Sequence, residues 1–128
     1  MKKWLLLIFF VNVVFAQITI EPNEKYNLKK VGHKTYELVL NDVTQTIVRL
    51  TGKVESNEYE RVEWFTEKKF KWSNGMATDE FKVVNPHTYS NKGVVNTMFG
   101  PLPEMKGRTV KITAKYKEFK DTIFIKLK

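Results

Sequence analysis

Apolar and polar residues alternate one by one near the end of the chain, and this pattern constrains the fold more than any other feature. The first run has Val110, Ile112, Ala114 and Tyr116 at its apolar positions and Lys111, Thr113, Lys115 and Lys117 at its polar positions. After a polar link over residues 118–121, Ile123, Ile125 and Leu127 repeat the pattern. A period of two places successive side chains on opposite faces of a strand. Two such runs predict an antiparallel hairpin.

The same period recurs earlier in the chain, in shorter runs separated by polar spacers. The expected inward positions are Ile18 and Ile20, then Tyr36, Leu38 and Leu40, then Val48, Leu50 and Val54, then Val62 and Trp64. A short strand is also expected around residues 93–99, inside an irregular stretch over residues 85–107. Many short strands are typical of sandwiches and barrels. Without an internal repeat or long linker, the sequence predicts a single all-β domain, an antiparallel β-sandwich over residues 17–128.

Residues 57–75 are open to two interpretations. Asn57 is suited to cap a helix and Gly75 to end it, with acids early and lysines late. Alternatively, two strands cover Val62–Phe65 and Lys69–Trp72. The aromatic, alternating character of the segment favours strands.

The first sixteen residues have the three parts of a secretory signal peptide. Met1-Lys2-Lys3 is positively charged, Trp4 to Val14 is apolar apart from Asn12, and Val14-Phe15-Ala16 suits a signal peptidase. As a helix the apolar stretch reaches about 20 Å, too short for a hydrocarbon core of about 30 Å. We therefore expect residues 1–16 to be cleaved and the mature protein, beginning at Gln17, to be periplasmic or secreted. An uncleaved anchor is the alternative.

Cysteine is absent, so the domain is expected to hold together by packing alone, without disulfides or an acylated cysteine anchor. The absence of an Asn-x-Ser/Thr acceptor also favours a bacterial exported protein over a eukaryotic secreted one.

Three segments together resemble bacterial immunoglobulin-like domains: Val62-Glu63-Trp64, residues 107–114, and residues 121–125. In that family one strand places a tryptophan against the core, and the last two strands form a long hairpin. The resemblance implies an immunoglobulin-like β-sandwich but supplies no ligand and no functional residue. The chain departs from the family's pattern in lacking the cysteine pair between sheets and in its long stretch from Met76 to Gly107.

The charge of the chain is basic, with 22 lysines and arginines against 14 acids. Loss of Lys2 and Lys3 with the leader reduces this to 20 against 14, a net charge of +6. The lysines alternate with apolar residues, as on the wet face of a sheet, and form no polybasic block. The charge is expected to aid approach to an acidic partner, while export disfavours nucleic acid.

Catalytic machinery is not visible in the sequence. Cysteine nucleophiles are absent, no serine has a nucleophile elbow around it, and the glycines form no phosphate-binding loop. His33 and His87 stand far apart, without the spacing of a known metal site. We therefore predict no catalytic residue, no metal and no cofactor. The expected function is a non-catalytic binding or structural module with a protein or glycan partner outside the cytoplasm and no transmembrane segment in the mature chain; its oligomeric state is left open.

Aromatic residues beyond the needs of the core point to the binding surface. The predicted ligand-binding residues are Phe65, Trp72, Tyr89, Met98 and Phe99. Flat rings bring contact area at little entropic cost. The preferred surface joins residues 88–91 to residues 97–103, whose two prolines stiffen it. Alternatively, Met98, Phe99 and Leu102 pack down to close the end of the sandwich.

Two rival functions use parts of this set. A carbohydrate-binding module would stack Trp72 or Phe65 on a sugar ring. A small exported inhibitor would insert the loop Met98–Pro103 into the cleft of a target.

Overall fold

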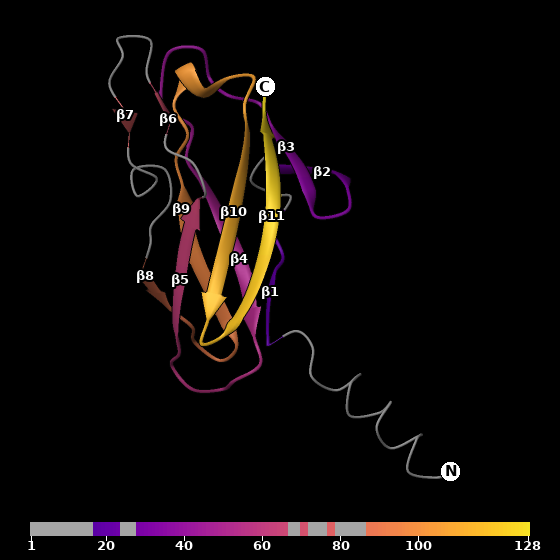
Figure 1. Ribbon diagram of the computed structural model, residues 1–128, viewed down its shortest axis with the longest axis vertical. Helices are drawn as coiled ribbons and strands as arrows, with labels where there is room; N and C mark the ends of the chain where they lie inside the picture. The colour runs from indigo at the N-terminus through magenta and orange to yellow at the C-terminus, as the bar shows by residue number, and fades with distance from the viewer. Residues whose placement is uncertain (1–16, 24–27, 67–69, 72–76, 79–86) are drawn as a thin grey trace.

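The computed structural model describes residues 17–23, 28–66, 70–71, 77–78 and 87–128. Two β-sheets face each other in a sandwich (Figure 1). The smaller sheet has the order β1 (Ile18–Ile20), β4 (Val48–Val54) and β9 (Val94–Phe99). The larger sheet has the order β2 (Leu28–Gly32), β3 (Thr35–Leu38), β11 (Phe119–Leu127), β10 (Thr109–Tyr116), β5 (Arg61–Thr66) and β8 (His87–Tyr89). A separate pair joins β6 (Phe70–Lys71) to β7 (Ala77–Thr78).

Strand direction within the sheets is antiparallel except at one boundary. β3 runs parallel to β11, with Tyr36 opposite Ile125. A short 3₁₀-helix, η3 (Pro103–Met105), lies between β9 and β10. No α-helix occurs in the described ranges, which confirms the predicted all-β sandwich.

The core lies between the two sheets and consists of the residues that the alternation pointed inward. Every inward position predicted from the alternating runs is buried, from Ile18 to Leu127. Leu28, Val95, Phe99 and Met105 complete this single cluster. The alternation therefore predicted the inward faces of β1, β3, β4, β5, β10 and β11 correctly.

Trp64 is the largest side chain that is fully buried in this core. Its indole Nε1 donates a hydrogen bond of 2.9 Å to Thr88 Oγ1, which donates in turn to the Val62 carbonyl at 3.2 Å. Across the sandwich the ring faces Gly52 of β4, where an added Cβ would lie 3.6 Å from Trp64, an ordinary contact, but only 3.1 Å from Val95 Cγ1 and 3.3 Å from the Thr19 carbonyl oxygen. The glycine in mid-strand is thus explained by the close approach of its neighbours on β9 and β1, in its own sheet.

Asp121 links the two sheets at the edge next to β1. Its Oδ2 accepts a hydrogen bond of 2.6 Å from the Ile20 backbone N–H and one of 2.7 Å from Lys34 Nζ. Ile20 belongs to the smaller sheet, whereas Asp121 and the β2–β3 turn belong to the larger one. The half-buried carboxylate therefore satisfies an edge N–H that no neighbouring strand pairs at this position.

The predicted C-terminal hairpin is confirmed and is longer than expected. β10 and β11 pair from Thr109 opposite Lys126 to Tyr116 opposite Phe119. The connection is therefore Lys117-Glu118 alone, and Lys117 adopts a left-handed φ of 55° that closes the turn. A second tight turn, at Lys92 and Gly93, leads from β8 into β9, the strand expected around residues 93–99.

The segment 57–75 contains strand β5, so the helical alternative is wrong for residues 61–66. The expected second strand is represented by β6, while Lys69 and Trp72 lie outside the described residues. The predicted signal peptide, residues 1–16, also lies outside them. Within the described ranges, no helix has the length and apolar character needed to cross a membrane.

Replacement of Gly52 by alanine is expected to destabilise the sandwich by about 1–3 kcal/mol, because the new methyl group presses on Val95 and on the backbone oxygen of Thr19 at 3.3 Å. The free energy of unfolding, measured by urea denaturation, checks this. Gly32→Ala is the matched control, because its Cβ would meet nothing closer than 3.7 Å. Equal losses in the two variants would show that strand glycines matter here for a reason other than packing.

Candidate binding site

The five predicted site residues are spread over different parts of the molecule. Phe65 is half-buried on the outer face of the larger sheet, and Tyr89, 64% exposed, lies on the same face at β8. Met98, 46% exposed, lies on the outer face of the smaller sheet. Phe99 is fully buried, and Trp72 lies outside the described residues. The structure therefore brings only Phe65 and Tyr89 to one face.

Phe99 is buried, as in the alternative in which Met98, Phe99 and Leu102 pack down, but Met98 is exposed, so that alternative holds only in part. Met98 and Phe99 both belong to β9, so their side chains point to opposite faces. The following residues Gly100 and Pro101 are buried as well, and Met105 of η3 closes the same end of the core. The loop Met98–Pro103 therefore does not project as an inhibitory loop would.

The expected continuous surface over residues 88–91 and 97–103 is also wrong. β9 crosses the length of the sandwich between these two segments, about 20 Å for six residues in a strand. Strand β8, which carries Tyr89, lies in the lower half of Figure 1, and the helical turn between β9 and β10 lies at the upper end. The candidate surface is thus divided into two ends.

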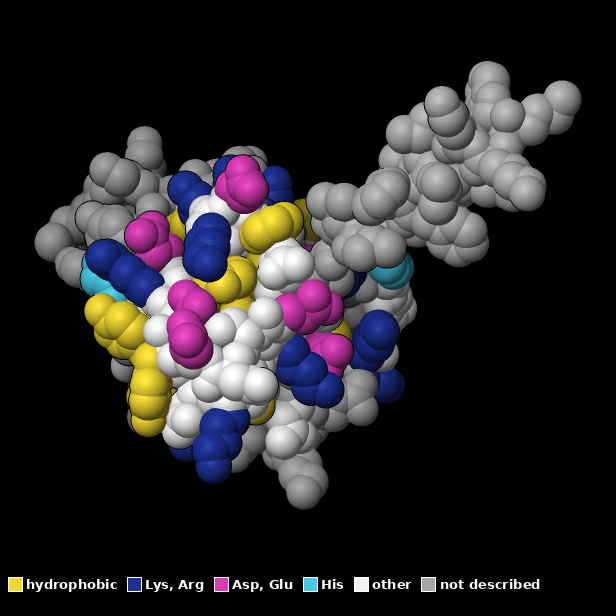
Figure 2. Space-filling model, turned by 90° about the horizontal axis from the view of Figure 1, so that it is seen from below, with side chains coloured by type: hydrophobic (Ala, Val, Ile, Leu, Met, Phe, Trp, Pro, Cys, Tyr) yellow, Lys and Arg dark blue, Asp and Glu magenta, His cyan; other side chains and the backbone are white. Residues whose placement is uncertain are grey.

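A pocket of about 270 Å³ opens near the lower end, beside β5 and β10. Its lining residues are Glu60, Arg61, Glu63, Lys115, Tyr116 and Lys117. β5 supplies Arg61 and Glu63 from its outer face, and β10 with its following turn supplies the lysines and the tyrosine. Figure 2 shows this end of the molecule, where basic, acidic and apolar side chains are intermixed. The pocket therefore offers donors and acceptors together.

Arg61 holds a fixed position in this pocket. Its Nη2 lies 3.1 Å from His87 Nδ1 and 3.8 Å from Glu63 Oε1. The pairing of β5 with β8 produces this arrangement, because it sets Glu63 opposite His87 and Arg61 opposite Tyr89. The exposed Tyr89 side chain thus stands on the strand next to the guanidinium. A guanidinium donates several hydrogen bonds in one plane, and an aromatic ring adds apolar contact area. Together the two groups suit a ligand with a polar ring.

Lys117 carries a stable positive charge at the edge of the pocket. Hydrogen bonding with the Tyr116 side chain, followed by its electrostatic effect and that of Glu60, raises the pKa of Lys117 above its ordinary value. The ammonium also lies 5.1 Å from the centre of the Tyr116 ring. A lysine is protonated at neutral pH in any case, and the raised pKa extends the charged range of Lys117 to higher pH.

The carboxylates of the pocket favour binding over acid–base catalysis. Glu63 has a half-exposed side chain, and Glu60 Oε1 accepts a hydrogen bond of 3.1 Å from Ser56 Oγ. General acid–base chemistry needs two groups in contrasting environments, one of them desolvated. Glu63 is exposed and Glu60 only half-buried, so neither of these acids is desolvated. In the described part of the chain, no group of three or more metal-ligating side chains is close enough to hold an ion.

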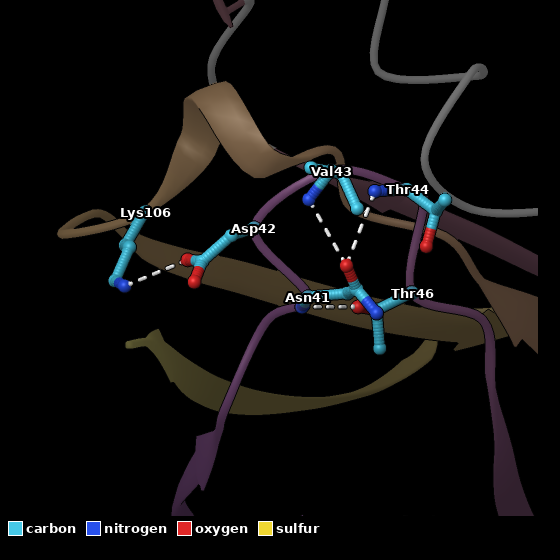
Figure 3. A network of polar contacts seen from close by, with 6 residues as sticks. All are labelled: Asn41, Asp42, Val43, Thr44, Thr46 and Lys106. Carbon is cyan, nitrogen blue, oxygen red and sulfur yellow. Dashed lines mark hydrogen bonds and ion pairs between the residues drawn. The ribbon is translucent and has the colours of Figure 1, made fainter.

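A second exposed surface at the upper end, the loop over residues 39–47, was missed by sequence reasoning. Asn41 Oδ1 accepts hydrogen bonds from the backbone N–H groups of Val43 at 3.0 Å and Thr44 at 3.3 Å (Figure 3). Thr46 Oγ1 accepts one from Asn41 N at 3.0 Å. In this turn the Val43 side chain points into solvent and is 84% exposed. Val39 and Ile47 of the same loop are also exposed. The signal in the sequence was an isolated valine after Asn-Asp, a turn-forming pair.

Further bonds attach this loop to the rest of the sandwich. Gln45 Nε2 donates to the Gly100 carbonyl at 2.7 Å, and Thr46 N donates to the Pro101 carbonyl at 3.1 Å. Lys106 Nζ lies 3.2 Å from Asp42 Oδ1 (Figure 3). The exposed aliphatic side chains are therefore presented by an ordered loop.

Comparison with known proteins shows a likeness in fold. No protein-family model matches the chain, and no curated protein matches it. Among solved structures, it is similar to a family 123 glycoside hydrolase from Clostridium perfringens, studied for its hydrolysis of glycolipid glycans. The TM-score is 0.54 and the sequence identity 8%, over 86% of this chain and 26% of the enzyme. The likeness shows a shared β-sandwich fold, and the chain spans about a quarter of the enzyme's length.

Proposed function

We propose that this protein is an exported, non-catalytic module that binds a glycan in the periplasm or outside the cell. The observation that carries this proposal is the pocket at the lower end, lined by Arg61, Glu63 and Lys115, with the exposed Tyr89 opposite Arg61 on the neighbouring strand. Sugar hydroxyls donate and accept hydrogen bonds at once, so a site for them needs both cationic donors and carboxylate acceptors. An aromatic side chain at the rim adds apolar contact for the carbon face of a sugar.

The size of the pocket agrees with a small polar ligand group. Its volume of about 270 Å³ lies just below the range of about 300–1,000 Å³ typical for drug-sized molecules. One sugar ring of a longer chain suits this volume better than an apolar cofactor. The fold shared with part of a glycoside hydrolase is compatible with a carbohydrate-associated module.

The sandwich is further proposed to be of immunoglobulin-like type. Three observations support this: the buried Trp64 on β5, the long hairpin of the last two strands, and an early strand, β3, paired parallel to the last one. The chain has no cysteine, and the packing around Trp64 holds the two sheets together in place of a disulfide.

The binding proposal is tested with the protein expressed from the full sequence and titrated against a panel of soluble oligosaccharides. Tyr89→Ala and Arg61→Ala are expected to weaken binding at least tenfold, since each removes a principal contact worth more than about 1.4 kcal/mol. Met98→Ala is the matched control, because Met98 is an exposed apolar residue on the opposite sheet. Unchanged affinity in the two pocket variants, or an equal loss in Met98→Ala, rejects this site.

Export is tested on the same preparation. The N-terminal sequence of the protein recovered from the periplasm or medium is expected to begin at Gln17, because Val14-Phe15-Ala16 suits the peptidase. Recovery only in the cytoplasm, or at the membrane with Met1 retained, contradicts the proposal of a cleaved leader.

Protein recognition through the upper end is a second candidate function, favoured by the ordered loop with exposed Val39, Val43 and Ile47. Val43→Asp is expected to abolish capture of a protein partner from an extracellular extract, because a charge would replace the most exposed apolar contact. Val94→Asp, on the outer face of β9, is the control. If both variants retain the partner equally, this loop is not the contact surface.

A further inference from the structure

His87 lies beside the pocket and contacts Arg61, one of the residues that line it. Arg61 Nη2 is 3.1 Å from His87 Nδ1, across the pairing of β5 with β8. A guanidinium carries five N–H donors and no acceptor, and it stays protonated in proteins. In this contact Arg61 can therefore only donate, and Nδ1 must accept. The geometry thus requires a neutral His87 whose proton is on Nε2.

The ionisable groups that face His87 come from the strands around it. Pairing sets Glu63 of β5 directly opposite His87, and Glu63 is itself opposite Lys115 of β10. Arg61 is the next outward residue of β5, and Tyr89 is the next outward residue of β8. β9, which also contacts β8, has no ionisable side chain. Within the part of the chain that the structure describes, His87 therefore faces one guanidinium and one carboxylate.

A neutral His87 helps to hold Arg61 in one orientation. Arg61 Nη2 donates to His87 Nδ1 and lies 3.8 Å from Glu63 Oε1. Both contacts are made at one end of a planar group, and the plane then fixes the directions of the remaining N–H donors. Because Arg61 lines the pocket, these donors meet a ligand in a set orientation. An exposed arginine without such contacts has more side-chain freedom to lose when a ligand binds.

A proton on Nδ1 removes this support. Imidazole is the side chain that ordinarily gains a proton between about pH 8 and pH 5. A protonated ring has two donors and no acceptor, so the hydrogen bond from Arg61 cannot form, and two cations stand 3.1 Å apart. Glu63, directly opposite His87, is then attracted to the imidazolium in competition with Arg61. Protonation therefore weakens both contacts that orient Arg61.

We propose that His87 is a positioning residue that makes glycan binding at this pocket sensitive to pH. Neutral His87 orients Arg61 for the sugar hydroxyls, and protonation of His87 releases Arg61 and weakens binding. This inference rests on the proposed glycan-binding function and adds regulation to the same pocket. The direction follows from the contact: affinity is highest at neutral pH and falls as the medium becomes acidic.

The binding test measures the affinity of the purified protein for cellohexaose, laminarihexaose, xylohexaose and chitohexaose. None of these probes has an ionisable group, so a change of affinity with pH comes from the protein. Between about pH 7.5 and about pH 5.5 the affinity of the parent protein is expected to fall about fivefold, the size of one net hydrogen bond. His87→Asn keeps an acceptor oxygen near the position of Nδ1 and does not titrate. It is expected to match the parent at neutral pH and to bind equally well at both pH values.

His33→Asn is the matched control, because His33 is the other histidine of the chain and is exposed in the β2–β3 turn. This variant is expected to keep the pH dependence of the parent. His87→Ala removes the acceptor and is expected to bind about fivefold more weakly at neutral pH, with no further loss in acid. Retention of the pH dependence in His87→Asn, or its disappearance in His33→Asn, overturns the inference.

A second readout needs no glycan, because nitrogen NMR spectroscopy reports which ring nitrogen carries the proton. At neutral pH the proton of His87 is expected on Nε2, and the Arg61 guanidinium signals are expected to shift as the ring gains its second proton. A neutral ring protonated on Nδ1, or Arg61 signals that stay constant through the titration, overturns the inference.

The failure of the inference and that of the proposed function give different results. Equal affinity of the parent protein at both pH values overturns the role of His87 but leaves the glycan-binding function intact. Absence of binding to every probe at both pH values, and to the oligosaccharide panel, overturns the proposed function and the inference with it.

Discussion

The burial of one indole ring between two sheets is the interaction on which the rest of this sandwich depends. Trp64 reaches across to Gly52, where an added Cβ would lie 3.6 Å from the ring, an ordinary contact distance. Its N–H is a polar group in an apolar core, and Thr88 satisfies it while bonding onward to Val62. The same threonine belongs to β8, so one hydrogen bond also orders the strand that carries Tyr89 and His87. Core packing and the site are thereby connected through two adjacent strands.

Much of the fold could be predicted from the sequence, because successive side chains on a strand point to opposite faces and this depends only on local sequence. Alternation alone predicted which residues of β4, β5, β10 and β11 face inward. It could not predict the order of strands, since the parallel pairing of β3 with β11 joins segments far apart in the chain. Turn geometry lay beyond it too: Lys117 takes a left-handed conformation that sequence statistics favour in glycine or asparagine.

The candidate site was less predictable for the same reason. Phe65 and Tyr89 were selected as exposed aromatics, but their common face follows from the pairing of β5 with β8. The contact of Arg61 with His87 spans 26 residues and has no local signal. Phe99 was misassigned because two nearby prolines indicated a loop, whereas β9 continues up to this residue and turns its ring inward. The residues of the candidate site are brought together by the pairing of strands, which is a property of the whole sheet.

Asp121 gives the molecule a mechanical property. The first described strand, β1, pairs with β4 through backbone hydrogen bonds. It is also bonded to β11, because the Ile20 N–H donates a hydrogen bond to the Asp121 carboxylate. Lys34 holds the same carboxylate from the β2–β3 turn. A pull on the chain ahead of Ile18 is therefore shared by both sheets from the start, and β1 cannot peel away without breaking a bond to the last strand. The N-terminal strand is thereby anchored to both sheets of the domain.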